Sequence, residues 1–173
     1  MEPQELAEVS EKAHGKIERS IGLTMAIVAA LLAAVTLMGH RLHTEETVEQ
    51  TKSADGWAYY QAKNGRYHMY AADARLAELI GAQGAAVAAE WKKTAEREKK
   101  EAEEIRRSTE KLDEETHTIA RRATFFDAAE ICIEVAIVLC SIALLTGSLV
   151  FWRISFVGTA IGIAVAAFGF FRG

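Results

Sequence analysis

Three carboxylates lie on one face of a predicted helix, at the start of an apolar segment. Asp127, Glu130 and Glu134 are spaced by three and then four residues, which brings them to the same side of an α-helix. Charge next to hydrocarbon is costly, so these groups must face protein, water or a cation. Two interpretations remain open: pairing with nearby basic side chains, or carboxylate rings in an oligomer that draw cations into a pore.

Basic side chains near the first apolar segment are candidates for the pairing. His40, Arg41 and His43 follow that segment, and they would meet the carboxylates if the first two apolar segments were antiparallel neighbours. Arg121 and Arg122, just before the carboxylates, are further candidates. The predicted ion-facing or interhelix polar cluster is Asp127, Glu130, Glu134, His40, Arg41 and His43.

Metal chemistry and catalysis have weaker support. Two imidazoles and one carboxylate could hold zinc, but His-x-x-His at a membrane border is a weak pattern, so we predict no metal site and no cofactor. The sequence contains no phosphate-binding loop, nucleophile elbow or paired-cysteine metal motif. We therefore expect a protein that is not an enzyme.

An aromatic set marks the polar region between the first two apolar segments. Trp57, Tyr60, Asn64 and Tyr67 share one helical face. They could pack within the protein, or they could form an oligomer or docking face, since aromatic side chains often anchor interfaces. A ligand site would need converging polar groups, which the sequence does not identify.

Three apolar segments must position these residues. Residues 20–39 and 154–171 contain no charge, and 123–151 is apolar over its second half. A helix of about 20 apolar residues crosses the hydrocarbon core of a bilayer. We predict transmembrane helices at these three places, preceded by a charged or amphipathic segment at 1–19.

The second and third predicted spans are separated only by Trp152 and Arg153. A connection this short makes the two helices antiparallel neighbours. Gly158, Gly162 and Gly169 give the third span a face of small residues, which lets membrane helices approach closely. This face could serve the contact between the second and third spans.

The insert at 40–122 carries two patterns of three-four spacing, typical of helices that pack along their length. In its second half a column of mostly large residues alternates with a column of small ones: Trp91, Glu98, Ile105, Leu112, Ile119 and Ala95, Ala102, Thr109, Thr116, Ala123. In its first half the pattern is Val48, Thr51, Asp55, Ala58, Ala62, Gly65, Met69, Ala72, Leu76 and Leu79. We expect these faces to pack together in an antiparallel, coiled-coil-like hairpin with its tip near 81–84.

The composition agrees with an all-helical membrane protein. The 173 residues include one proline, and alanine is abundant, so helices are favoured over strands. The net charge of -4 argues against a nucleic-acid binder, which needs a concentrated basic face. The predicted fold class is therefore all-α, with three transmembrane helices and a long antiparallel hairpin between the first and second.

Several stretches of sequence resemble a known family. The run WAYYQAK at 57–63, IALLT at 142–146 and FWRIS at 151–155 resemble an uncharacterised bacterial family, known only as a domain of unknown function with three spans and a helical insert. The resemblance supports the architecture and implies no activity. In the family pattern the turn after the second span is richer in arginine, whereas this chain keeps Arg153 alone.

That resemblance implies a multi-pass protein of the cytoplasmic (inner) membrane, with a cytoplasmic N-terminus and an extracytoplasmic hairpin. The expected partners are the lipid bilayer and further copies of the chain or a larger membrane complex, and not nucleic acid. We expect a scaffold or accessory subunit that uses the hairpin as a spacer or docking surface. The alternative is a cation channel or proton-conducting subunit built around the carboxylates of the second span.

Overall fold

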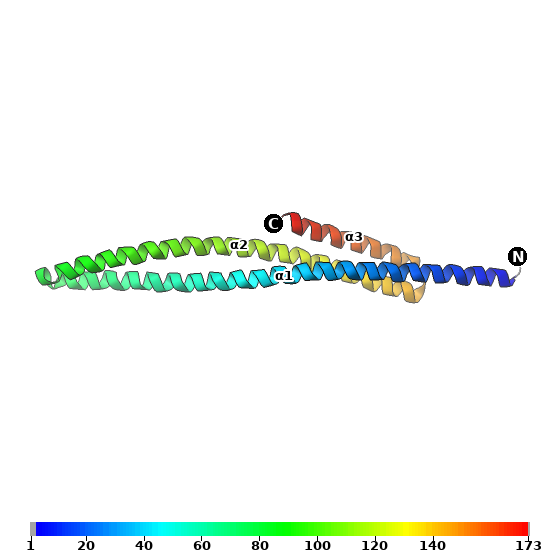
Figure 1. Cartoon of the computed structure of the whole chain (residues 1–173), viewed down its shortest axis with the longest axis horizontal. Helices are drawn as coiled ribbons and strands as arrows, with labels where there is room; N and C mark the ends of the chain where they lie inside the picture. The colour runs from blue at the N-terminus through cyan, green and yellow to red at the C-terminus, as the bar shows by residue number, and fades with distance from the viewer. Residues whose placement is uncertain (1–2, 173) are drawn as a thin grey trace. The chain divides into compact units, whose positions relative to one another are not determined.

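The computed structural model describes residues 3–172, with side chains from Gly15 onward. Apart from short connections the described chain is helical and contains no strand, which confirms the all-α prediction. The elements are α1 (Pro3–Leu79), the 3-10 turn η1 (Gly81–Gln83), α2 (Ala85–Thr146) and α3 (Leu149–Phe171) (Figure 1). The side chains of the predicted N-terminal segment, 1–19, lie mostly outside the described residues, although α1 already begins at Pro3.

Glycines in the left-handed region of backbone space end the two long helices. Gly81 has φ +78° and Gly147 has φ +66°, and glycine adopts this conformation without the steric cost of a Cβ atom. The break at Gly81 lies where the tip of the insert was predicted. The second break corrects the predicted turn at Trp152 and Arg153, because both residues lie inside α3, which begins at Leu149.

Contacts divide the chain into two compact units. The insert unit is Glu45–Thr118, and the terminal unit joins the residues up to Thr44 with those from Ile119 onward. The predicted insert, 40–122, extends slightly beyond the insert unit at both ends. Each of the three helices contains a segment long and apolar enough to cross a membrane, by length and composition.

In the terminal unit, apolar side chains of α1 pack on α2 in two clusters. Val28 of α1 contacts the cluster around Ile133, and Leu42 lies with Phe126 in the second cluster. Ile133 is fully buried. The carboxylate-bearing part of α2 therefore lies between two apolar contacts with α1.

Small residues of α3 pack against α2. A Cβ atom added at Gly162 would lie 2.6 Å from Cγ1 of Ile133, and one added at Gly169 would lie 2.7 Å from Cβ of Phe125. The buried thiol of Cys140 also donates a hydrogen bond to Oγ of Ser155 at 3.1 Å. The glycine face anticipated in the sequence thus serves the contact between α2 and α3.

In the insert unit, the α2 pattern packs as predicted. Ala95, Ala102 and Thr109 are buried, and the large residues of the other column, such as Trp91 and Ile105, are half-buried. The pattern works because small residues let the neighbouring helix approach closely while the larger ones cover the sides of the contact.

The predicted face of α1 is wrong. Every residue of that pattern is exposed, including Met69 at 50% and Leu79 at 84%. The packed residues follow those of the predicted pattern by one or two positions, about 100° to 200° around the helix. Its members are Ser53, Gly56, Tyr60, Lys63, Tyr67, Tyr70, Ala74 and Ala77. Both faces have three-four spacing, but the packed face carries the polar groups that match those of α2.

The close contact at Gly162 predicts a specific cost for a larger residue. We expect Gly162→Ala to lower the free energy of unfolding by about 1–3 kcal/mol relative to Gly22→Ala, because an overpacked contact forces neighbours to shift. Gly22 has nothing within 4 Å of an added Cβ, so it reports the gain in helix propensity alone. Thermal unfolding of the detergent-purified variants measures the difference, and equal stability would contradict the packing described.

Candidate functional site

The first of the three carboxylates is paired across α1 and α2. Nε2 of His43 lies 3.0 Å from Oδ1 and 3.2 Å from Oδ2 of Asp127. Both side chains are about half exposed, at 48%. The contact is an ion pair when the imidazole is protonated and a hydrogen bond otherwise. It joins two residues of the predicted polar cluster.

The other two carboxylates have different surroundings. Thr36 Oγ1 donates a hydrogen bond to Glu130 Oε1 at 2.8 Å. Glu134 is exposed, and it makes no hydrogen bond or ion pair with any side chain between Gly15 and Arg172. Glu134 lies beside Ile133, which packs on Gly162, so it is level with the middle part of α3.

The remaining members of the predicted cluster stay apart from the carboxylates. His40 and Arg41 are exposed on α1, and neither bonds to Asp127, Glu130 or Glu134 in the part of the chain that the structure describes. Within the same part, no group of three or more His, Cys, Asp or Glu side chains is arranged to hold a metal ion. The zinc alternative therefore gains no support.

The predicted aromatic face lies along the contact between α1 and α2 in the insert unit. Trp57, Tyr60, Asn64 and Tyr67 are all half-buried. The rings of Trp57 and Tyr60 meet edge to face with centroids 5.8 Å apart. This arrangement agrees with packing inside the protein, although each of these residues remains partly exposed.

Asp113 accepts hydrogen bonds at one end of this face, a role that the sequence analysis does not predict. Nε1 of Trp57 donates to Asp113 Oδ2 at 3.0 Å, and the hydroxyl of buried Ser53 donates to Oδ1. These two hydrogen bonds, led by that from Ser53, lower the pKa of the Asp113 carboxyl against the opposing effect of desolvation. An aspartate one position after the heptad residue Leu112 gave no signal beyond an ordinary surface charge.

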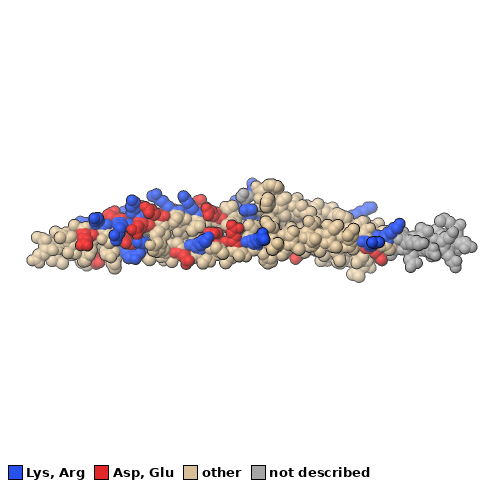
Figure 2. Space-filling view, viewed as in Figure 1, with Lys and Arg blue, Asp and Glu red and all other residues tan. Residues whose placement is uncertain are grey.

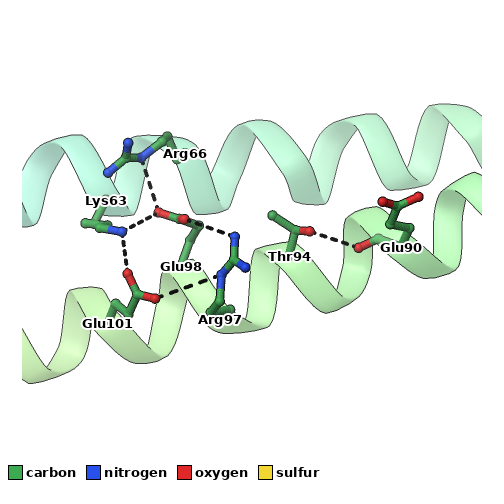
Figure 3. Close-up of polar contacts among 7 residues, drawn as sticks. All are labelled: Lys63, Arg66, Glu90, Thr94, Arg97, Glu98 and Glu101. Carbon is green, nitrogen blue, oxygen red and sulfur yellow. Dashed lines mark hydrogen bonds and ion pairs between the residues drawn. The ribbon is translucent and has the colours of Figure 1, made fainter.

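A charged layer crosses the same contact further along (Figure 3). The ammonium of Lys63, 8% exposed, lies 3.2 Å from Oε2 of Glu98, 6% exposed, and also bonds to Glu101. Nε of Arg66 lies 3.2 Å from the same Glu98 oxygen. Arg97 adds longer contacts to both carboxylates. Two buried, opposite charges are thus surrounded by exposed ones.

The charged layer is a strong electrostatic match between the helices. The hydrogen bond to Glu101 is the main cause that raises the pKa of Lys63, and the same bond lowers the pKa of Glu101. Breaking a buried ion pair leaves an uncompensated charge. The layer therefore favours one rotation and one register of α1 against α2.

The side of α1 turned away from α2 forms an apolar surface, here called the outer stripe. Its residues are Val48, Thr51, Asp55, Ala58, Ala62, Gly65, Met69, Ala72, Leu76 and Leu79. By contrast, every exposed residue of α2 between 90 and 115 is charged except Ser108. The turn end of the insert unit is also uncharged (Figure 2), since 79–89 contains no Asp, Glu, Lys or Arg.

Comparison with known proteins identifies a family but no activity. The profile of one protein family, described as a domain of unknown function (DUF4337), matches residues 17–172. No curated protein and no solved structure matches the chain. Function must therefore be inferred from the arrangement of the residues themselves.

The lowered pKa of Asp113 predicts an acid-sensitive contribution to stability. Its ionised form is stabilised in the fold, so the contribution is complete above the pKa of an unfolded aspartate, about 3.9, and is lost as the pH falls through the folded value. We expect Asp113→Asn to lower the melting temperature at pH 7 and to approach the wild type at pH 3. Circular dichroism melts measure both values.

Glu115→Gln is the matched control, since Glu115 is exposed on the same helix. We expect it to differ little from the wild type at pH 7. A difference between Asp113→Asn and the wild type that stayed constant from pH 7 to pH 3 would contradict the role given to the two hydrogen bonds.

Proposed function

This chain belongs to the DUF4337 family, and from that premise we propose that it is a non-enzymatic integral membrane protein, an oligomeric scaffold or an accessory subunit of a larger membrane complex. The three long apolar segments support insertion in a bilayer, because each can satisfy its backbone hydrogen bonds within a helix. The terminal unit would be the membrane part. The resemblance noted in the sequence supports a bacterial inner membrane.

We propose that the insert unit is an antiparallel hairpin that stands off the membrane. The hydrogen bonds between α1 and α2 support opposite chain directions, because later residues of α1 pair with earlier residues of α2. Ser53 donates to Asp113, Lys63 donates to Glu101, and Lys92 donates to Glu78. An arm of about 35 residues has a length of roughly 50 Å. The hairpin would then act as a spacer, on the extracytoplasmic side if the N-terminus is cytoplasmic.

The observation that carries the scaffold proposal is the outer stripe. Heptad-spaced apolar residues normally mark the contact between two helices, yet Met69, Leu76 and Leu79 are exposed at 50%, 60% and 84%. The exposed side of α2 between residues 90 and 115 is charged and has no such face. The stripe therefore suits a helix of a second copy or of another subunit, with α1 as the docking helix.

The outer stripe is a better docking surface than the aromatic face proposed from the sequence. Tyr60 and Tyr67 already face α2, and Trp57 is held by Asp113. Replacing these residues would weaken the fold of the insert unit together with any assembly. The stripe can be altered without touching those contacts.

We expect Met69→Asp with Leu76→Asp to dissociate the assembly without unfolding the chain. Removing a buried side chain of this kind from an interface costs about 1.5–3 kcal/mol, which is tenfold or more in the dissociation constant. Native mass spectrometry of the detergent-purified chain measures the particle mass, and circular dichroism measures the helix content.

Ser108→Asp is the matched control, because it places the same group on the charged side of α2. It should leave the particle mass unchanged. An unaltered mass in the double stripe variant, at the same protein concentration, would reject the outer stripe as the assembly surface.

The exposed position of Glu134 favours a second candidate function, that of a cation channel or proton-conducting subunit. The exposed carboxylate of Glu134, next to the fully buried Ile133, is costly in lipid unless another chain or water covers it. Further along that side, Ser141 is bonded to the carbonyl of Ile137, and the surrounding exposed residues are apolar. A continuous polar path is therefore poorly supported.

Ion flux through reconstituted vesicles separates the two functions. For a scaffold we expect no cation or proton flux above that of empty vesicles, and we expect Glu134→Gln to assemble as the wild type does. Flux in the wild type that is lost in Glu134→Gln would instead favour the channel. The conservative change keeps the shape of the side chain while removing its charge.

A further inference from the structure

The end of the terminal unit nearest the C-terminus of α3 is rich in arginine. Leu42 of α1, Phe126 of α2 and Ala166 of α3 meet there. Four arginines lie within a few residues of this meeting point in the sequence: Arg41, Arg121, Arg122 and Arg172. A concentration of guanidinium groups on three helices calls for anionic partners.

The carboxylates at this end do not supply those partners. Asp127 is joined to His43, and Glu130 accepts from Thr36. Over residues 15–172, none of the four arginines forms an ion pair with a carboxylate. The four guanidinium groups are therefore not paired with carboxylates of the described chain, and they outnumber Asp127 and Glu130 at this end.

Arg122 is the most unusual of the four. Its Nε is buried, and no hydrogen-bond acceptor reaches it within the described part of the chain. A buried donor without an acceptor is costly, and such groups are nearly always satisfied in native proteins. The two Nη atoms of Arg122 are not buried, so an anion from outside the chain can reach the guanidinium group through them.

The surroundings of Arg122 connect it with the end of α3. Its carbonyl oxygen would lie 3.7 Å from a Cβ added at Gly169, so the two backbones approach closely. The rings of Phe125 and Phe168 meet edge to face at 5.2 Å, and the guanidinium of Arg172 lies 4.9 Å from the Phe168 ring centre. Two arginines therefore flank one aromatic pair at the boundary of α2 and α3.

We propose that the boundary of α2 and α3 at Arg122 and Arg172 binds the phosphate of an anionic phospholipid. A guanidinium group binds phosphate oxygens through two parallel hydrogen bonds, and basic sites between membrane helices bind anionic head groups. The apolar clusters on one side and the end of α3 on the other place the two arginines at a membrane border, provided that the proposed insertion holds. The aromatic pair would contact the first part of an acyl chain.

The opposite end of the terminal unit offers a natural comparison. Lys16, Arg19 and Arg153 are basic residues there, and all three are exposed. None has a buried, unsatisfied atom. Arg153→Gln is therefore the matched control for Arg122→Gln, since both replace one arginine of the terminal unit with glutamine.

The test is a titration of the full detergent-purified chain with short-chain phosphatidylglycerol, followed by melting temperature and by native mass spectrometry of bound lipid. We expect the wild type and Arg153→Gln to be stabilised alike. Arg122→Gln should weaken the apparent affinity by about tenfold, as expected for losing charged hydrogen bonds. Arg172→Gln should weaken it less, because that side chain is exposed.

Three results would overturn the proposal. Equal lipid affinity in the wild type and Arg122→Gln would remove Arg122 from any lipid site. A lower melting temperature in Arg122→Gln, with the lipid-dependent shift intact, would show that Arg122 only supports the end of α3. Full protection by inorganic phosphate alone, at the same concentration, would assign the site to a soluble anion.

Failure of the lipid site can be told apart from failure of the scaffold. Arg122→Gln should leave the particle mass unchanged, and the stripe variants should keep the full phosphatidylglycerol shift. Membrane fractionation of the unaltered chain tests insertion itself. A chain recovered free of membranes would end both proposals together.

Discussion

The buried ammonium of Lys63 between Glu98 and Glu101 determines which side of α1 faces α2 in the insert unit. If α1 turned to bury its apolar outer stripe, Glu98 would remain in the contact without a cation, which is strongly unfavourable. The indole of Trp57 would also lose Asp113. Electrostatic and hydrogen-bond matching thus accompanies the choice of packed face, and the outer stripe is left exposed.

The terminal unit follows a different rule, since close packing of small residues replaces charge matching. Gly162 and Gly169 bring α3 onto α2, and apolar side chains hold α1 to α2. The three carboxylates on one helical face consequently have three environments: Asp127 paired with His43, Glu130 bonded to a hydroxyl, and Glu134 exposed. Only Glu134 is without a hydrogen-bond or ion-pair partner in the described part of the chain.

The sequence predicts where the helices lie better than it predicts which side of each helix is packed. The heptad columns of α2 identify its packed side, because large and small residues there alternate without a competing pattern. On α1 two faces share the same spacing, and periodicity does not report that Lys63 and Ser53 have partners on α2. The sequence predicts the turn at Trp152 and Arg153, the charged interruption between the apolar segments, whereas the helix ends earlier, at Gly147. The pairing of His43 with Asp127 could be predicted, because both residues belong to the predicted polar cluster. The hydrogen bond from Thr36 to Glu130 could not, because Thr36 lies among the apolar residues of the first span.

The repeating contact of the insert unit also limits how its length can change in evolution. The packed residues of both arms repeat every seven residues. The chain turns at Gly81, where the two arms end. A lengthened arm keeps its contact only if the other arm gains a matching heptad on the same side of the charged layer. Relatives with a longer or shorter insert unit should therefore differ by whole heptads in both arms. The turn at Gly81 and the charged layer at Lys63 should be retained.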